Sequence, residues 1–213
     1  MWELIRAGNV MMIPLGLCSL IGLTIFLERL FALRRHKIIF PEVAEAVETL
    51  PASDSHDIAY AIIDRNPGPF ANVVRAGLDH ADYEWQIVRD VLQETGRQEA
   101  VRLVRNLNIL EIVAAVAPLL GLLGTVTGMI RVFAAISTIG LGNPEQLSGG
   151  ISEAMVTTAA GLIIGIPALV GHHWLQGRAD AIIFDLERYA SQILGHLRER
   201  TLRRGRSAAG GED

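Results

Sequence analysis

One acidic residue stands at the edge of a membrane-length apolar stretch. After Glu153, no charged residue or histidine occurs before His172. A carboxylate in such a segment is costly, and residues of this kind usually face a bundle interior or a water-filled path. Two hydroxyl side chains, Thr157 and Thr158, follow the acid closely. An acid with neighbouring hydroxyls in an apolar segment indicates the passage of an ion.

Small residues form two stripes at helical spacing. One stripe surrounds the acid and comprises Gly150, Ala154, Thr158, Gly161, Gly165 and Ala168. The other lies earlier in the chain and comprises Ala114, Ala117, Pro118, Gly121, Gly124, Thr125, Gly128 and Ala135. Spacings of three and four residues place each set on one helix face. A small-residue face lets a neighbouring helix approach closely in lipid, so we expect close-packed helices beside the ion path.

Three uncharged runs divide this 213-residue chain, half of which is apolar: 10–27, 112–130 and 154–171. A membrane-spanning helix needs roughly 17–25 mostly apolar residues, and each run meets that requirement. A helix in a soluble core would carry charges on its outer side. The sequence therefore predicts an all-α membrane protein with three transmembrane helices.

Several other functions are disfavoured by the residue inventory. Cys18 is the only cysteine, which excludes an intrachain disulfide and a cysteine metal cluster. The adjacent His172 and His173 do not face each other on a helix, so we interpret them as interfacial anchors. Ser152 and His172 are some 30 Å apart along one helix, too far for a protease dyad. We predict no enzyme activity, no metal, no cofactor and, with dispersed basic residues, no nucleic-acid binding.

Basic residues flank the spans asymmetrically. They follow the first run at Arg29, Arg34, Arg35 and Lys37, and they recur in the tail after residue 176. The connection 137–149 contains no lysine or arginine. By the positive-inside rule, the N-terminus is predicted outside and the C-terminus in the cytoplasm. We expect an interfacial turn at 1–9 and disorder at 207–213.

The predicted organisation has six parts. They are a first transmembrane helix in 1–35, a cytoplasmic helical region 36–110, a second transmembrane helix 111–136, a periplasmic loop 137–149, a third transmembrane helix 150–175 and a cytoplasmic helical tail 176–213. An amphipathic stripe starting near Tyr83, with Asp82 as a plausible N-cap, runs into the second span, and a helix continuous to Ser137 would be roughly 80 Å long. The second and third helices are thus expected to extend far into the cytoplasm. Pro118 and Pro167 are predicted kinks.

Two blocks of sequence carry a resemblance to a known family. The first is Ala117-Pro118-Leu119-Leu120-Gly121-Leu122-Leu123-Gly124-Thr125-Val126-Thr127-Gly128-Met129-Ile130. The second is Gly150-Ile151-Ser152-Glu153-Ala154, followed by Thr158-Ala159, Gly161-Leu162 and Ile166-Pro167-Ala168. At this spacing the blocks resemble the MotA/TolQ/ExbB proton-channel family, most closely its ExbB branch. The chain departs from the family pattern at Thr127, Ser152 and Arg131, where Trp, Ala and smaller polar residues are common.

The resemblance implies a function and an assembly. It implies a homopentamer in the bacterial inner membrane whose pore holds an ExbD- or TolR-like single-span dimer, each copy bearing an aspartate. Glu153, Thr125 and Thr158 match the positions that line the pore or proton path. The pore wall is expected at Gly121, Gly124, Gly128, Ala154, Gly161 and Gly165. Such a stator would couple proton motive force, through a TonB-like transducer, to outer-membrane transport; a TolQ-like role in envelope maintenance and a passive helical scaffold are the alternatives.

The key residues also have plainer interpretations. If the helix begins at Gly149 or Gly150, Glu153 lies in its first turn and gains only from the macrodipole. Thr125 and Thr158 are equally compatible with hydroxyls that bond within their own helices. Arg131 has no acid near it in sequence, and it either reaches to lipid headgroups or belongs to the ion entrance. A solute transporter is disfavoured because no inverted repeat is visible.

Overall fold

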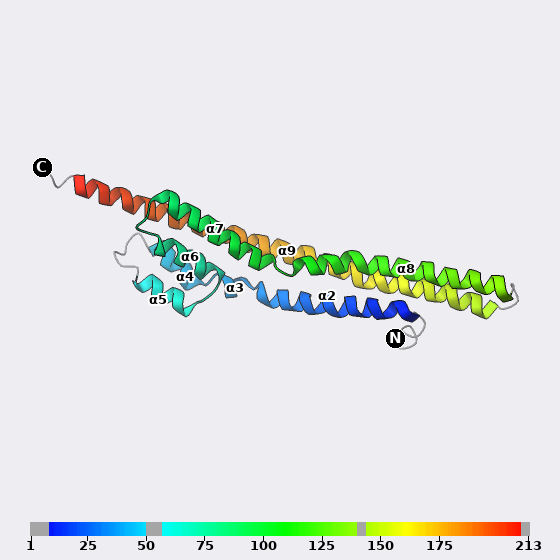
Figure 1. Cartoon of the computed structure of the whole chain (residues 1–213). Helices are drawn as coiled ribbons and strands as arrows, with labels where there is room; N and C mark the ends of the chain where they lie inside the picture. Colours follow the sequence, from blue (N-terminus) through cyan, green and yellow to red (C-terminus); the bar gives the residue numbers. More distant parts are fainter. Residues whose placement is uncertain (1–8, 50–56, 140–143, 210–213) are drawn as a thin grey trace. The chain divides into compact units, whose positions relative to one another are not determined.

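Helices account for every regular element in the described part of the chain (Figure 1). The computed structural model describes residues 9–49, 57–139 and 144–209. The elements are η1 (Asn9–Met11), α2 (Met12–Ala32), α3 (Arg35–Ile38), α4 (Pro41–Thr49), α5 (Asp57–Arg65), α6 (Pro69–Asp79), α7 (Trp85–Val104), α8 (Leu107–Ile139) and α9 (Pro144–Ala209). The predicted all-α class is confirmed.

Three helical segments are long and apolar enough to cross a membrane: α2, the stretch Trp85–Ser137 that includes most of α8, and α9. Their outward faces carry large apolar side chains that a soluble protein would hide. Examples are Leu20 and Leu119, each more than 60% exposed, and Ile163, which is 71% exposed. Lipid is the solvent in which such faces are stable. The chain is therefore a three-span membrane protein.

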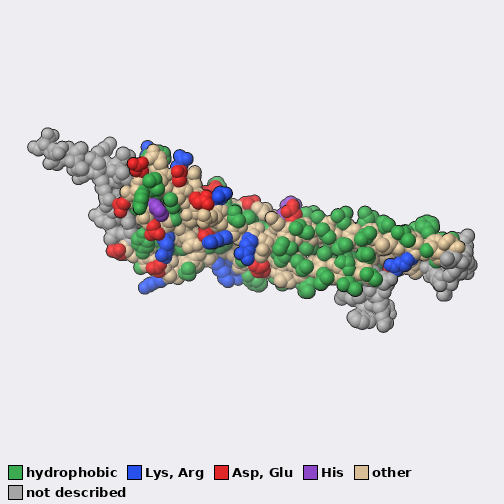
Figure 2. Space-filling model, in the orientation of Figure 1, with side chains coloured by type: hydrophobic (Ala, Val, Ile, Leu, Met, Phe, Trp, Pro, Cys, Tyr) green, Lys and Arg blue, Asp and Glu red, His purple; other side chains and the backbone are tan. Residues whose placement is uncertain are grey.

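The chain forms two compact units. The apolar unit comprises Met1–Leu30 and Asn106–Gln176, and the polar unit comprises Phe31–Arg105 and Gly177–Asp213. In the apolar unit α2, α8 and the first part of α9 pack together, and hydrophobic side chains dominate their visible surface (Figure 2).

The helix that enters the second span is interrupted. α7 ends at Val104 and α8 begins at Leu107, so the predicted uninterrupted helix from Tyr83 to Ser137 is wrong. Asn106 has a φ of 67°, in the left-handed region that ends helices and that asparagine tolerates better than most residues. α7 starts at Trp85 with Glu84 in the cap position, and the predicted N-cap at Asp82 is also wrong.

The third span begins earlier than its glycines suggest. α9 starts at Pro144, where proline's fixed φ suits the first helical turn, and α8 extends to Ile139. The helical part of the chain therefore includes most of the loop predicted at 137–149. Glu153 lies more than two turns inside α9. A helix-start acid is thus the wrong interpretation of Glu153.

Other predictions fall at or beyond the limits of the described residues. α9 continues to Ala209, so the tail predicted to be disordered from Ser207 is helical over its first three residues. The remaining part of that tail and the interfacial turn predicted before Asn9 lie outside the described residues. Pro118 and Pro167 sit inside α8 and α9, and their role as kinks stays a prediction.

The polar unit has a core of large side chains. Phe70 on α6 is fully buried and packs against the ring of Tyr189 on α9, with centroids 4.8 Å apart. Gly77 on the same helix makes room for Ile193, whose methyl group would lie 2.9 Å from an added Cβ. Burial of apolar area against water stabilises this packing. The unit thus folds as helices of a soluble protein do.

Candidate functional site

The backbones of α8 and α9 touch along a seam of small residues. A Cβ added to Gly161 would lie 2.6 Å from the Ala117 carbonyl oxygen, and one added to Gly121 would lie 2.9 Å from the Thr157 carbonyl oxygen. Real Cβ atoms do not approach other atoms so closely. Only glycine therefore allows the two helices to pack at this distance.

The seam continues in both directions. Gly128 packs on Ala154, and Gly165 packs on the Pro118 ring, which an added Cβ would meet at 2.6 Å. All six small residues predicted for the pore wall are buried within the chain: Gly121, Gly124, Gly128, Ala154, Gly161 and Gly165. They set how closely α8 and α9 approach, and their place in a pore wall stays a prediction.

Two predicted hydroxyl side chains meet across the seam. The Oγ1 atoms of Thr125 on α8 and Thr158 on α9 are hydrogen-bonded to each other. Thr158 Oγ1 also lies 3.1 Å from the Gly121 carbonyl oxygen, and Thr125 Oγ1 lies 3.3 Å from the Ala154 carbonyl oxygen. Both hydroxyls therefore bond to the opposite helix, which distinguishes them from hydroxyls that bond only within their own helix.

A third hydroxyl lies beside them, that of Thr157, which was noted in sequence after Glu153 but is not among the proton-path residues that the resemblance implies. Thr157 is 1% exposed, and its Oγ1 atom donates to the Ala154 carbonyl oxygen at 2.9 Å. It occupies the space that a side chain at Gly124 would need. The sequence signal was a threonine directly beside the small-residue stripe of α9. Recognising that Thr157 faces Gly124 required the register between the two helices.

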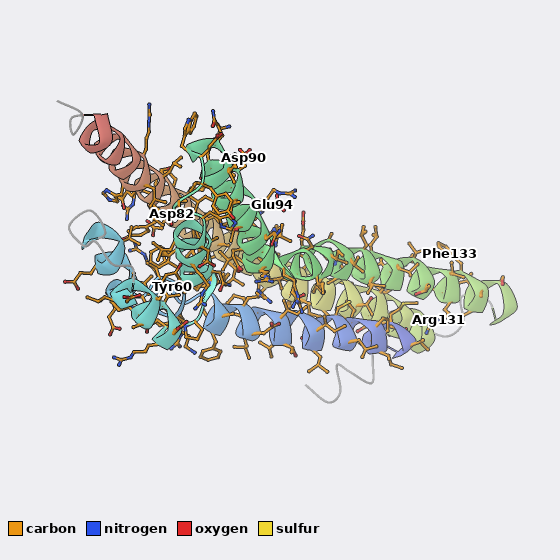
Figure 3. All side chains as sticks on the ribbon, turned by 60° about the vertical axis from the view of Figure 1, so that its left-hand side comes forward. Tyr60, Asp82, Asp90, Glu94, Arg131 and Phe133 are labelled. Carbon is orange, nitrogen blue, oxygen red and sulfur yellow. The ribbon has the colours of Figure 1, made fainter. Side chains whose placement is uncertain are left out.

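Arg131 and Glu153 form an ion pair across the seam. The Arg131 Nη1 atom lies 2.9 Å from both Glu153 carboxylate oxygens. The Glu153 side chain is 15% exposed and the Arg131 side chain 46% exposed. In Figure 3 Arg131 and Phe133 are labelled towards the C-terminal end of α8 and leave the helix on different sides. Arg131 thus has an acidic partner, which neither interpretation from the sequence had identified.

The polar groups of the seam are connected through backbone carbonyls. The Glu153 carbonyl oxygen accepts a hydrogen bond from Thr157, and the Ala154 carbonyl oxygen accepts from both Thr125 and Thr157. A hydroxyl both donates and accepts, so it can receive a proton on one side and release one on the other. The arrangement can hold a charge at Glu153 and hydrogen-bond a mobile proton along the threonines.

The other end of the apolar unit holds a separate polar group. His172 is 8% exposed, and its Nδ1 atom lies 3.1 Å from the Leu107 carbonyl oxygen. The interpretation of His172 as an exposed interfacial anchor is therefore wrong, although His173 is exposed. In the described residues no three His, Cys, Asp or Glu side chains are grouped to hold a metal ion.

An apolar groove lies between α2, α8 and α9. Its volume is about 920 Å³, and Cys18, Phe26, Leu110 and Trp174 are among its walls. None of the described residues that line it is charged. The lining of the groove is thus mainly apolar, in contrast to the polar seam.

The comparison with known families decides the identity of this architecture. The profile of the MotA/TolQ/ExbB proton channel family matches residues 65–188, more than half of the chain. The chain belongs to the MotA/TolQ/ExbB proton channel family. The matched region contains α6, α7, α8 and the apolar part of α9, so it includes the whole α8–α9 seam.

Named relatives come from two branches of the family. The chain is 36% identical over 169 residues to the putative biopolymer transport protein ExbB-like 1 of Synechocystis, covering 76% of this chain and 65% of that protein. It is 29% identical over 179 residues to the biopolymer transport protein exbB1 of Vibrio cholerae, covering 82% and 78%. It is 34% identical over 96 residues to the Tol-Pal system protein TolQ of Haemophilus influenzae, covering 45% and 42%.

Proposed function

We propose that this chain is the proton-channel and stator subunit of an inner-membrane motor that uses proton motive force to do work at the outer membrane. The observation that carries the proposal is the polar set in the α8–α9 seam. Arg131 is the only charged residue of α8 between Ile112 and Ile139, and Glu153 is the only one of α9 between Gln146 and Gly171. Intramembrane charges are expensive and mark ion paths.

The proposed assembly is a homopentamer around an ExbD- or TolR-like single-span dimer. Its support is the family membership and the distribution of exposed apolar side chains, since Phe133, Met155 and Ile163 are all more than 60% exposed in the single chain. Neighbouring copies and lipid would cover these faces. The positive-inside pattern supports an outside N-terminus and a cytoplasmic C-terminus.

In the proposed mechanism a proton enters through an aspartate of the partner helix. One charge crossing the membrane potential releases about 2.3 kcal/mol per 100 mV. This free energy can drive motion only if protonation changes how the partner binds the channel wall. Thr125 and Thr158 would hydrogen-bond the proton along its route, and Glu153 would supply the polar contact near one end. Repeated steps would turn the inner dimer.

The ExbB-named and TolQ-named relatives are compatible with two different roles for the proposed stator. An ExbB-like subunit would act on an outer-membrane transport system through a TonB-like transducer, and a TolQ-like subunit would act in envelope maintenance. The ExbB version is favoured because the ExbB-named relatives of Synechocystis and Vibrio cholerae match more than three quarters of this chain, whereas the TolQ relative of Haemophilus influenzae matches 45%.

A liposome experiment separates a proton channel from a passive scaffold. The chain is reconstituted alone and with an ExbD-like single-span partner, a potassium potential is imposed, and proton uptake is followed with a pH-sensitive dye. We expect uptake that depends on the partner and is abolished in Glu153→Ala, with partner binding retained. Glu111→Ala, which removes an exposed acid of α8 outside the seam, is the matched control and should conduct normally.

Two results would contradict the proposal. Absence of partner-dependent uptake in the wild-type complex would favour the scaffold. Full uptake in Glu153→Ala would place the proton route elsewhere.

A further inference from the structure

Arg131 and Glu153, the only charged residues in the apolar stretches 112–139 of α8 and 146–171 of α9, form an ion pair with each other. They are 22 residues apart in the chain and on different helices, yet Nη1 of Arg131 contacts both carboxylate oxygens of Glu153 at 2.9 Å. The other charged residue of α8, Glu111, lies 20 residues before Arg131. Between Ile112 and Ile139 of α8 and between Gln146 and Gly171 of α9, the pair holds the only two charges of the sequence.

The pair is unequally exposed. The Glu153 side chain is 15% exposed and so is nearly enclosed by its own chain, whereas the Arg131 side chain is 46% exposed. A guanidinium carries five N–H donors, and the contacts to Glu153 involve only Nη1. The outer edge of the guanidinium therefore faces the surroundings of the chain, where a second acidic group can reach it.

We propose that Arg131 is a positioning residue that holds the Glu153 carboxylate out of proton exchange in the partner-free subunit, and that an acidic side chain of the docking partner competes for the guanidinium and releases Glu153. This inference rests on the proposed function, because it names the control of that same site. A ligand shifts a conformational equilibrium only through different interactions with the two states. Competition between two carboxylates for one guanidinium provides that difference.

In this proposal the channel is closed to protons as long as no partner is bound. In a seam whose other side chains are uncharged, the pair satisfies both charges, and loss of one member leaves the other uncompensated. A released carboxylate would be free to exchange protons with hydroxyl groups of the seam, and Thr157 follows Glu153 by one helical turn and donates to its backbone carbonyl oxygen. The pair held together cannot do so. Arg131 thereby prevents proton leakage before the motor is assembled.

Carbodiimide labelling tests the inference directly. Dicyclohexylcarbodiimide enters membranes and reacts with protonated carboxyl groups, so its rate at Glu153, measured by mass spectrometry, reports release of the acid. We expect slow labelling in the partner-free wild type and in Arg131→Lys, which keeps the charge. We expect labelling at least about tenfold faster in Arg131→Gln and Arg131→Met, equivalent to about 1.4 kcal/mol in the population of released acid. Glu111 in the same samples is the internal control.

A second labelling experiment uses only the wild-type protein, with and without its partner. Wild-type protein with its partner should label at Glu153 faster than the wild type alone, because the partner's acid takes the guanidinium. Equal rates with and without the partner would overturn the inference even if the neutral variants do not reach the membrane. Wild-type rates in both neutral variants would overturn it as well.

The exchange variant Arg131→Glu/Glu153→Arg distinguishes control from simple structural pairing. It restores an ion pair, so normal folding is expected. Proton uptake with the partner should nevertheless be lost, because the carboxylate now lies on α8. Normal uptake in this variant would contradict the positioning role.

The tests also separate the two levels of the account. Uptake in the wild-type complex together with unchanged labelling in the Arg131 variants would reject the inference and leave the proposed function standing. Absence of uptake in the wild-type complex would reject the proposed function, and labelling of the chain alone would still decide whether Arg131 restrains Glu153.

Discussion

The apolar and polar units are both built of packed helices, but part of the α8–α9 seam in the apolar unit brings backbone against backbone. At Gly121 and Gly161 in the apolar unit, the nearest atoms of the facing helix belong to the backbone. At Gly77 in the polar unit, they belong to the side chains of Ile193 and Leu92. In lipid no hydrophobic force brings helices together, so close backbone packing replaces it. The surrounding solvent thus determines which residues can form a helix contact.

The apolar and polar units also differ in the number of charged residues around their ion pairs. The polar unit carries several ion pairs with at least one well-exposed member, including Arg35–Asp185 and Arg97–Glu94. Pairs of this type contribute about 0–1 kcal/mol each. The pair on the α8–α9 seam is exposed to a similar degree, since Glu153 is 15% and Asp185 14% exposed, but no other charged residue lies between Ile112 and Ile139 of α8 or between Gln146 and Gly171 of α9. Its removal should therefore affect function far more than removal of a surface pair.

The largest effect on stability is expected in the core of the polar unit. Phe70→Ala removes a fully buried ring that packs on Tyr189, and it should lower the free energy of unfolding by about 3–5 kcal/mol. Phe184→Ala is the matched control, because that ring is 67% exposed and its loss should cost less than about 0.5 kcal/mol. Chemical unfolding in detergent measures both. Equal losses would show that the polar unit is not held by its buried side chains.

A smaller effect, with opposite signs in the two units, is expected from adding one methyl group. Gly161→Ala should destabilise the apolar unit by about 1–3 kcal/mol, because the Ala117 carbonyl must move. Gly96→Ala in α7 meets nothing within 4 Å and should stabilise its helix by up to about 1 kcal/mol. Thermal unfolding of the two variants side by side checks this. Destabilisation by both would remove the distinction between the units.

The smallest effect concerns pH and the water-exposed edge of the polar unit. Burial, together with the hydrogen bond and negative charge of Asp79, raises the pKa of Tyr60 to about 12 (Figure 3). The neutral phenol is favoured in the folded state, so its stabilising contribution is complete below pH 10 and is lost as the pH rises through about 12.

Tyrosinate absorbance measures this shift. The difference between wild type and Tyr60→Phe isolates one of the three tyrosines, and its midpoint should lie near pH 12. Asp79→Asn should lower that midpoint because it removes the negative charge. A midpoint at the ordinary value of 10.0 in folded protein would contradict the described contact.

The spans and the small-residue stripes were predictable from sequence because each depends on a local pattern. Uninterrupted hydropathy marks a span, and glycine spacing marks a helix face that can be approached closely. The start of α9 was missed although Pro144 carries a local signal for a first helical turn. The break before α8 was missed because Asn106 is a weaker terminator than glycine, and only its left-handed φ identifies it.

The ion pair of the site could not be predicted from local patterns. Pairing Arg131 with Glu153 requires the register of α8 against α9, which is set by the glycine contacts along the whole seam. Thr157 depends on the same register, because its hydroxyl occupies the space beside Gly124. By contrast, Thr125 and Thr158 were identified through the family resemblance, and the structure brings their hydroxyls together.

The account depends most directly on whether protons use the hydroxyls of the seam. The double variant Thr125→Val/Thr158→Val keeps the shape of both side chains and removes the hydroxyl–hydroxyl contact. The control is Thr24→Val, which removes an exposed hydroxyl of α2 that bonds to the Leu20 carbonyl oxygen of its own helix. Proton uptake by the partner-bound complex in liposomes should fall by at least about tenfold, or about 1.4 kcal/mol, in the first variant and stay unchanged in the second. Wild-type uptake by the double variant, with the complex intact, would contradict the account.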